Sequence, residues 1–344
     1  MYIGTYRKPG PAEGIYLARF NTETGALSQP ELAVKTEAPG FLVQHPSKKI
    51  LYAVAQSDQG VCAFAIEADG KLREISRQHS KGDGPTHLAI DRDGRNLYVA
   101  NYNTSSIARL PIAADGTLLP ACFSEQRAGK GADRKRQEAP HPHSVYVDRD
   151  NVHLYTCDLG LDRVYVYGFD PKRPELVPDD PPFASTAPGA GPRHLAFSAG
   201  DAILYVANEL NSTVTAFSRD AKSGALKELQ TIPTLPPDYF KGECNPAEVW
   251  VHPNGKFLYL SNRGPDTIAT FSIATDGRLT LLSQTPTGGK HPRYFEFDPT
   301  GAFLIVGNMN SQQIVVFRVD AASGALGRVG EVECPQPSCF LFPK

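Results

Sequence analysis

The feature of this sequence that most constrains its fold is a unit that recurs seven times along the chain. In each unit a proline opens a short apolar strand, a glycine turn leads to a second strand containing Leu-Tyr or a variant, and a third strand is followed by a Gly-x-Leu turn. The opening prolines are Pro39, Pro85, Pro142, Pro192, Pro246, Pro292 and Pro337. Their spacing of roughly 45 to 57 residues is typical of four-stranded β-propeller blades.

Local patterns within each unit indicate strands. Apolar residues alternate with polar ones, β-branched and aromatic residues are frequent, and Asp-Gly pairs stand where hairpins would turn, at Asp69-Gly70, Asp115-Gly116 and Asp276-Gly277. Almost no segment has the 3.6-residue period of a helix. The sequence therefore predicts an all-β chain with antiparallel blades.

The two ends of the chain are predicted to share the seventh blade. The last unit stops after one strand, at 336–342, and residues 2–27 supply the strands that it lacks. Pairing them closes the ring and removes the exposed edge strands of an open array. Since no linker divides the units, we expect residues 1–344 to form a single seven-bladed propeller domain.

Composition excludes several classes of partner. The chain has 35 basic and 37 acidic residues and a net charge of −2, so no strong field attracts nucleic acid or an anionic membrane, and the basic run 134–136 reads as a solvated loop. No stretch resembles a membrane-spanning helix or a signal peptide. The six cysteines lack a C-x-x-C pair and read as reduced core thiols. We expect a cytoplasmic protein, most simply a monomer.

Residues that build blades should recur in every unit, whereas residues of a single active site need not. In a four-stranded blade, the turn before the first strand and the turn after the second lie on the same face, at the mouth of the central channel. The two positions after each proline read Gly40-Phe41, Thr86-His87, His143-Ser144, Arg193-His194, Ala247-Glu248, Arg293-Tyr294 and Ser338-Cys339. The two positions at the end of each second strand read Thr5-Tyr6, Gln56-Ser57, Asn101-Tyr102, Asp158-Leu159, Asn208-Glu209, Asn262-Arg263 and Asn308-Met309.

The nearly uniform Asn column is predicted to be structural, because Asn and Asp side chains satisfy backbone groups at turns. The charged residues at the variable positions are different. His143, Arg193, Glu209 and Arg263 belong to three successive blades, and Glu248 and Arg293 extend the arc. Singly, each has a plain interpretation, such as an ion pair within one blade. Together on one face they indicate a functional site.

This set of residues suits the hydrolysis of an anionic lactone. Arginines bind phosphate or carboxylate, and a histidine with a glutamate supplies acid and base near neutral pH. A cation can stabilise the oxyanion of the tetrahedral intermediate. The sequence has no Gly-x-Ser-x-Gly elbow, P-loop or dinucleotide fingerprint. His141 and His143 flank Pro142 on a loop, so we expect neither a metal nor a cofactor.

A long segment rich in glycine and charge, from Phe123 to His141, separates the second and third units at the same rim. Its composition is typical of a mobile loop. We interpret it as a partial lid that carries Arg136 and Gln137 toward the ligand.

The sequence also resembles the lactonase family of seven-bladed propellers, which includes bacterial 6-phosphogluconolactonase and fungal carboxy-muconate cyclase. The resemblance covers essentially the whole chain. The motifs that carry it are Tyr2-Ile3-Gly4-Thr5-Tyr6, Arg136-Gln137, Pro140-His141-Pro142-His143-Ser144, Gly191-Pro192-Arg193-His194, Val206-Ala207-Asn208-Glu209, Ser261-Asn262-Arg263-Gly264 and His291-Pro292-Arg293. Met309 departs from the polar residue that a ligand contact in the sixth unit would favour.

By this resemblance, His143, Arg193, Glu209 and Arg263 match the family's proposed catalytic set, with Arg136, His194, Glu248 and Arg293 as candidate substrate contacts. Glu209 and His143 would share the acid and base roles, and Arg193 and Arg263 would bind charge. The implied reaction is hydrolysis of 6-phospho-D-glucono-1,5-lactone in the pentose phosphate pathway. Two alternatives stay open: a cycloisomerase acting on carboxy-muconates, and a non-catalytic propeller that binds a ligand or protein through aromatic rim residues such as Tyr6 and Tyr102.

Overall fold

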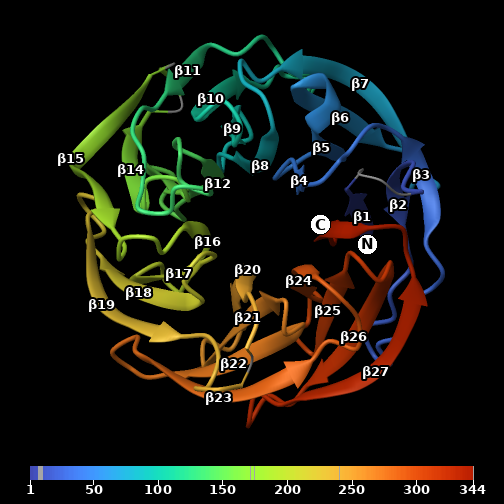
Figure 1. Cartoon of the computed structure of the whole chain (residues 1–344). Helices are drawn as coiled ribbons and strands as arrows, with labels where there is room; N and C mark the ends of the chain where they lie inside the picture. Colours follow the sequence, from blue (N-terminus) through green and yellow to red (C-terminus); the bar gives the residue numbers. More distant parts are fainter. Residues whose placement is uncertain (7–10, 171, 174, 240, 344) are drawn as a thin grey trace.

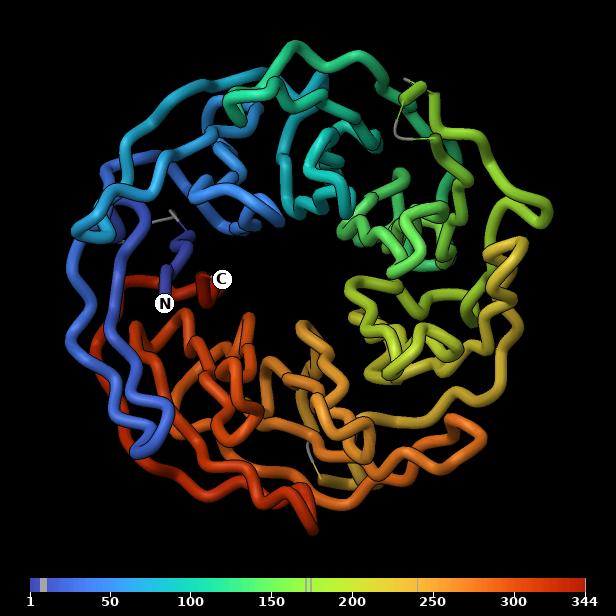
Figure 2. The backbone as a smooth tube through the Cα atoms, turned by 180° about the vertical axis from the view of Figure 1, so that it is seen from behind, coloured from blue at the N-terminus to red at the C-terminus, as the bar shows by residue number. Residues whose placement is uncertain are grey.

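The computed structural model describes every residue except 7–10, 171, 174, 240 and 344. Seven four-stranded antiparallel sheets stand around a central axis, as blades of a propeller (Figures 1 and 2). One 3₁₀ helix, η1 (Gln56–Asp58), accompanies 28 strands in the described part of the chain. The prediction of an all-β, seven-bladed propeller is confirmed.

We number the blades in chain order. Blade 1 contains β4 (Leu42–Gln44), β5 (Ile50–Ala55), β6 (Gly60–Ile66) and β7 (Leu72–His79); blade 2 contains β8 (Pro85–Ile90), β9 (Asn96–Asn101), β10 (Ser106–Pro111) and β11 (Phe123–Gln126). Blade 3 contains β12 (Pro142–Val147), β13 (His153–Asp158), β14 (Arg163–Phe169) and β15 (Leu176–Ser185); blade 4 contains β16 (Pro192–Phe197), β17 (Ile203–Asn208), β18 (Thr213–Arg219) and β19 (Leu226–Pro233).

Blade 5 contains β20 (Asn245–Val251), β21 (Phe257–Arg263), β22 (Thr267–Ile273) and β23 (Leu279–Pro286); blade 6 contains β24 (Pro292–Phe297), β25 (Phe303–Asn308), β26 (Gln313–Val319) and β27 (Leu326–Glu333). Blade 7 contains β28 (Pro337–Leu341), β1 (Tyr2–Thr5), β2 (Gly14–Leu17) and β3 (Glu31–Lys35). The first strand of each blade lies nearest the axis (Figure 1).

The ring closes where the sequence predicts. The C-terminal strand β28 pairs antiparallel with the N-terminal strand β1, with Ile3 opposite Phe340, and the two termini lie side by side in both views (Figures 1 and 2). Five innermost strands begin at the repeated proline itself. A proline suits the first residue of a strand because it cannot donate to the ladder.

The repeated Leu-Tyr of the second strand has a specific task between blades. In five blades the tyrosine hydroxyl donates to a glycine carbonyl in the outer hairpin of the next blade: Tyr2 to Gly70, Tyr52 to Gly116, Tyr155 to Gly224, Tyr205 to Gly277 and Tyr259 to Gly324, at 2.8–3.0 Å. Gly277 has φ +85°, a conformation that glycine adopts without strain. The Leu-Tyr strand and the glycine hairpin therefore build each blade and also join it to its neighbour.

The apolar core lies between adjacent blades. Third-strand aromatics such as Phe64, Phe217 and Phe271 are at most 1% exposed and pack beside second-strand residues of the neighbouring sheet. All six cysteines are unpaired; five are buried, whereas Cys122 is exposed and not the core thiol that the sequence predicts. Within the described ranges, no helix is long and apolar enough to cross a membrane.

Candidate active site

A β-bulge at the start of the innermost strands places the residue after the proline at the channel mouth. In blade 3, Pro142 pairs with Asp158 and Ser144 pairs with Cys157, so His143 between them has no partner in the ladder. The same register shift releases Thr86, Arg193 and Arg293 in blades 2, 4 and 6. Bulges commonly re-aim a side chain next to a functional site.

The end of the second strand supplies the other half of the rim. The amide nitrogen of Tyr102 donates to Gly84 O at 2.9 Å, and that of Glu209 donates to Gly191 O at 2.7 Å. The preceding asparagines are fully buried, and Asn101 Nδ2 donates to Ser80 O. The prediction that the Asn column satisfies backbone groups is confirmed for Asn101, whereas Asn208 Nδ2 donates to the hydroxyls of Thr213 and Thr215.

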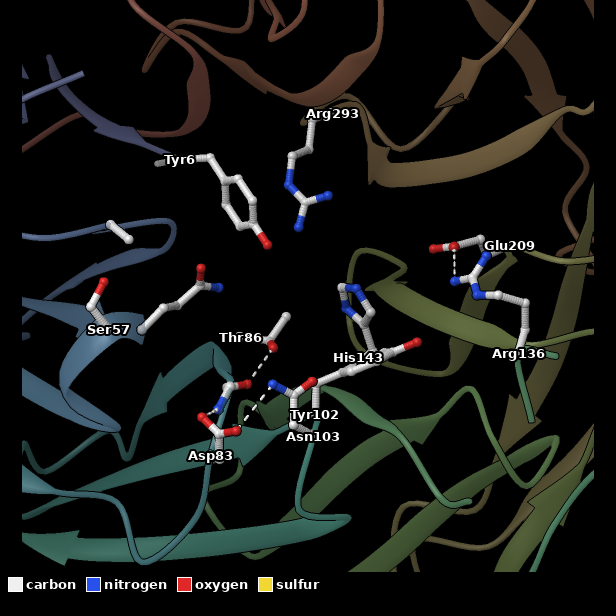
Figure 3. Close-up of a pocket in the computed structure, with 13 residues that line it drawn as sticks. Tyr6, Ser57, Asp83, Thr86, Tyr102, Asn103, Arg136, His143, Glu209 and Arg293 are labelled. Atoms are coloured by element: carbon white, nitrogen blue, oxygen red, sulfur yellow. Dashed lines mark hydrogen bonds and ion pairs between the residues drawn. The ribbon is translucent and has the colours of Figure 1, made fainter. Parts of the chain in front are cut away.

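These two positions surround a pocket of about 510 Å³ at the mouth of the channel (Figure 3). It is lined by Tyr6, Ala38, Gln56, Ser57, Asp83, Gly84, Thr86, Tyr102, Asn103, Arg136, His143, Glu209 and Arg293. Four residues that the sequence singled out thus lie on its wall: Arg136, His143, Glu209 and Arg293. Asp83 and Asn103 were not anticipated. The signal for Asp83 was a charged residue two positions before the blade-opening Pro85.

Glu209 lies at the centre of three arginines. Its Oε1 is 2.6 Å from Arg136 Nη2, and its Oε2 is 3.0 Å from Arg193 Nε and 2.9 Å from Arg263 Nη2. The contact with Arg193 is an ion pair without good hydrogen-bond geometry, because the Nε–H has no acceptor in line. Burial alone would raise the pKa of Glu209, but Arg263 and Arg193 outweigh it and hold that pKa well below its ordinary value. The carboxylate is therefore permanently ionised and a weak base.

The sequence predicts Arg193 and Arg263 as site residues, and the structure places them next to Glu209 but not in the pocket lining. Arg193 is 2% exposed and donates from Nη1 to Ala247 O at 2.6 Å, whereas Arg263 donates from Nε to Asn245 O at 2.9 Å. Both guanidinium groups form ion pairs with the Glu209 carboxylate. Their charges make the electrostatic potential in the pocket more positive, although their side chains do not line it.

His143 presents a neutral imidazole to the pocket. Burial, reinforced by the nearby Arg193 charge, lowers the pKa of His143 well below its usual value, against the opposing effect of Glu209. Its Nδ1 is buried and has no hydrogen-bond partner among the described residues, and its ring meets the edge of Tyr102 at 5.7 Å between centroids. The unprotonated imidazole lines the pocket and can accept a proton, whereas Glu209 is held as an anion by its three arginines.

Arg293 is the second cation on the wall. Its guanidinium lies 5.0 Å from the centre of the Tyr6 ring, a cation–π distance, and both side chains face the cavity (Figure 3). Burial and the charge of Arg263 lower the pKa of Arg293, yet a guanidinium stays protonated at neutral pH.

The side chains at the second position after each proline do not line this pocket. Phe41, His87, His194 and Tyr294 from four blades form a chain of ring contacts across the channel, with Phe41 and His87 only 3.9 Å apart. Beneath them His194 Nδ1 lies 2.9 Å from Glu248 Oε2. Burial raises the pKa of Glu248 to about 8 and lowers that of His194, so the pair is neutral as a whole.

His194 and Glu248 also lie outside the pocket lining. The sequence predicts both as substrate contacts, but each is at most 4% exposed and neither lines the pocket. The reason is the alternation of side chains at the bulge: one residue reaches the mouth and the next one turns into the channel.

The segment 123–141 differs from the predicted mobile lid. It begins as strand β11, and Gln137 is fully buried, donating from Nε2 to Leu159 O at 2.8 Å and to Asp162 Oδ1 at 2.7 Å. Gln137 thus anchors the segment to blade 3 and does not line the pocket. Arg136 reaches the pocket, as expected, and its bond to Glu209 is visible in Figure 3.

Across the described ranges no three His, Cys, Asp or Glu side chains are grouped as a metal site would require. The pocket wall carries two arginines, a neutral histidine and two carboxylates, Glu209 and Asp83. Together these groups can bind an anion and move a proton.

Comparison with known proteins gives a consistent set of relatives. Residues 1–342 match the family model described as "Lactonase, 7-bladed beta-propeller". The chain is 34% identical to a 6-phosphogluconolactonase of Bacillus subtilis, covering 99% of this chain and 97% of the relative, and 34% identical to one of Serratia proteamaculans over 89% and 88%. Among solved structures, a periplasmic gluconolactonase of Pseudomonas aeruginosa superposes with a TM-score of 0.90 at 34% identity, covering 98% of this chain and 96% of that chain.

Proposed function

This chain belongs to the lactonase family of seven-bladed β-propellers, and we propose that it hydrolyses 6-phospho-D-glucono-1,5-lactone to 6-phosphogluconate. The observation that carries the substrate proposal is the excess of positive charge at the pocket. Arg136 and Arg293 lie on its wall and Arg193 and Arg263 pair with Glu209 from behind, so four arginines stand against two carboxylates, Glu209 and Asp83. Such a pocket favours a phosphorylated lactone over a neutral one. Relatives named 6-phosphogluconolactonase support the same choice.

In this proposal His143 is the general base. It takes a proton from the water that attacks the lactone carbonyl carbon, and Arg293 stabilises the negative charge that develops on the carbonyl oxygen. When the tetrahedral intermediate collapses, the ring oxygen leaves and receives the proton from the His143 imidazolium. The new carboxylic acid then ionises, so one proton is released to solvent for each lactone opened.

Glu209 has an electrostatic role in this scheme. Because three arginines hold its pKa low, it stays ionised through the reaction and favours the imidazolium that forms on His143 in the transition state. The division of roles left open by the sequence, Glu209 or His143, is thus proposed to fall on His143.

The test is a coupled assay in which a dehydrogenase generates the lactone in place and its loss is followed above spontaneous hydrolysis. We expect the wild type to accelerate the loss and His143→Gln to reduce kcat by about 10²-fold or more. His79→Gln, at an exposed histidine of the outer strand β7, is the matched control and should keep full activity.

Two outcomes would reject this proposal. A folded wild type that does not accelerate hydrolysis would remove the substrate assignment, and a fully active His143→Gln variant would remove the assigned base.

Location and assembly follow only in part from these findings. The Pseudomonas aeruginosa relative is named periplasmic, so the relatives do not share one compartment by name. For this chain we retain the cytoplasmic location and the monomeric state as proposals, to be checked by cell fractionation and by light scattering of the purified protein.

A further inference from the structure

The pocket has two walls of different chemistry, and Figure 3 shows them facing each other. The first, which we call the cationic wall, carries Arg136, His143, Glu209 and Arg293. The second, which we call the polar wall, carries Gln56, Ser57, Asp83, Thr86 and Asn103, from blades 1 and 2. The polar wall has no cation among its side chains and one carboxylate.

Blade 1 has a different residue at the position where most other blades have the buried asparagine, and this residue belongs to the polar wall. Blades 2, 4 and 6 end their second strands with Asn101, Asn208 and Asn308, whose side chains are fully buried. Blade 1 instead carries Gln56 at the start of the short helix η1, and this side chain lines the pocket. The side-chain amide of Asn101 stabilises a turn, whereas that of Gln56 lines the pocket.

The polar wall has unused hydrogen-bonding capacity. Within the described residues, neither the Gln56 amide nor the Ser57 hydroxyl has a protein partner in hydrogen-bond geometry. Thr86 Oγ1 donates to Gly84 O at 2.7 Å, which leaves its oxygen free to accept. Amides and hydroxyls that line a pocket without protein partners are bound by water or by the polar groups of a ligand.

Asp83 on the polar wall is fixed by hydrogen bonds and also has hydrogen-bonding capacity left for a ligand. Its amide nitrogen donates to Thr104 Oγ1 at 2.9 Å, and its Oδ1 accepts a hydrogen bond from the Gly84 amide at 2.8 Å. Its Oδ2 has only a long contact, 3.4 Å, with Asn103 Nδ2. This oxygen can therefore accept from a ligand hydroxyl, whereas it would repel a phosphate or carboxylate.

From these two walls we infer that the polar wall is a subsite for the hydroxyl groups of a polyhydroxylated lactone, opposite an anion subsite on the cationic wall. The inference rests on the proposed function and deepens it. Asp83 fixes the direction of the substrate, because its charge excludes the anionic end from the polar wall. A volume of about 510 Å³ is within the usual range for small-molecule sites.

The inference distinguishes two substrate classes that the arginines alone do not. A sugar lactone offers several hydroxyls to Gln56, Ser57 and Asp83, whereas a carboxy-muconolactone is an anion that offers none. A site built to bind a substrate hydroxyl rejects an analogue without it, because its polar groups are left unpaired.

The test is calorimetric binding of two anions of similar length: 6-phosphogluconate, and 6-phosphonooxyhexanoate, which lacks the hydroxyls. We expect the wild type to bind 6-phosphogluconate at least tenfold more tightly. Gln56→Leu should reduce this ratio by about threefold to tenfold, and Asp83→Asn by about tenfold or more, with little change in affinity for the hexanoate. Asp83→Asn keeps an oxygen for the Gly84 amide, so the loop should stay folded.

Arg293→Gln is the matched control on the opposite wall, and it should weaken both ligands by a similar factor. Equal affinity of the wild type for the two anions, or no binding of either, would overturn the polyol subsite. So would variants of the polar wall that weaken both ligands alike. Because binding is measured without turnover, failure of the subsite and failure of the hydrolysis proposal are separate results.

Discussion

The clearest consequence of the site is that Glu209 is held as a structural anion. Glu209→Gln keeps the size of the side chain but removes the charge that pairs with Arg136, Arg193 and Arg263. Two of these arginines are at most 8% exposed, so the change leaves buried cations without a counter-charge. Removing one partner of a buried ion pair costs about 3–5 kcal/mol.

That cost converts into a thermal shift. At about 2.1 cal/mol/K per residue, a chain of 344 residues has an unfolding entropy of roughly 0.7 kcal/mol/K, so the apparent Tm should fall by about 4–7 °C. The assay is thermal unfolding followed by circular dichroism at pH 7.5. Added phosphate should restore more stability to the variant than to the wild type, since an anion can occupy the emptied positive site.

Glu248→Gln is the matched control. Glu248 is equally buried, but its raised pKa makes it a neutral hydrogen-bonding partner of His194, so an isosteric amide should cost about 1 kcal/mol or less. If Glu209→Gln kept or raised the Tm while kcat collapsed, Glu209 would be a destabilising catalytic base. That outcome would refute the assignment of the base role to His143.

Two further predictions concern stability. Tyr205→Phe removes the hydroxyl that binds Gly277 O and should lower the free energy of unfolding in urea by about 0.5–1.5 kcal/mol. Tyr98→Phe should leave it unchanged, because the Tyr98 hydroxyl has no partner among the described residues. Equal losses would contradict the interblade role of the Tyr205 bond. Burial lowers the pKa of His87 to about 3, so the folded chain keeps it neutral while the unfolded chain protonates it below about pH 6.5. Stability should therefore decline as pH falls from 6.5 toward 3, by at most ~1.4 kcal/mol per pH unit from this residue, and His87→Gln should make that decline shallower in denaturation curves.

The sequence by itself determined the architecture, because every blade repeats the same local signals. The proline, the Leu-Tyr strand and the glycine hairpin are short-range features, and their period predicts both the number of blades and the closure by β28 and β1. The same repetition identified the rim positions at which the side chain varies between blades. These positions include His143, Glu209 and Arg293, which all line the pocket.

Only the tertiary structure decided which charged residues line the pocket. Arg193 and Arg293 both follow a blade-opening proline and both occupy a bulge, so they are equivalent in the sequence. Arg193 turns toward Glu209 and Ala247 and is buried, whereas Arg293 lies over Tyr6 from the closing blade and faces the cavity. Their surroundings come from neighbouring blades that are distant in the chain. A side chain's direction at a bulge is set by the charges and rings across the channel, and no local pattern records them.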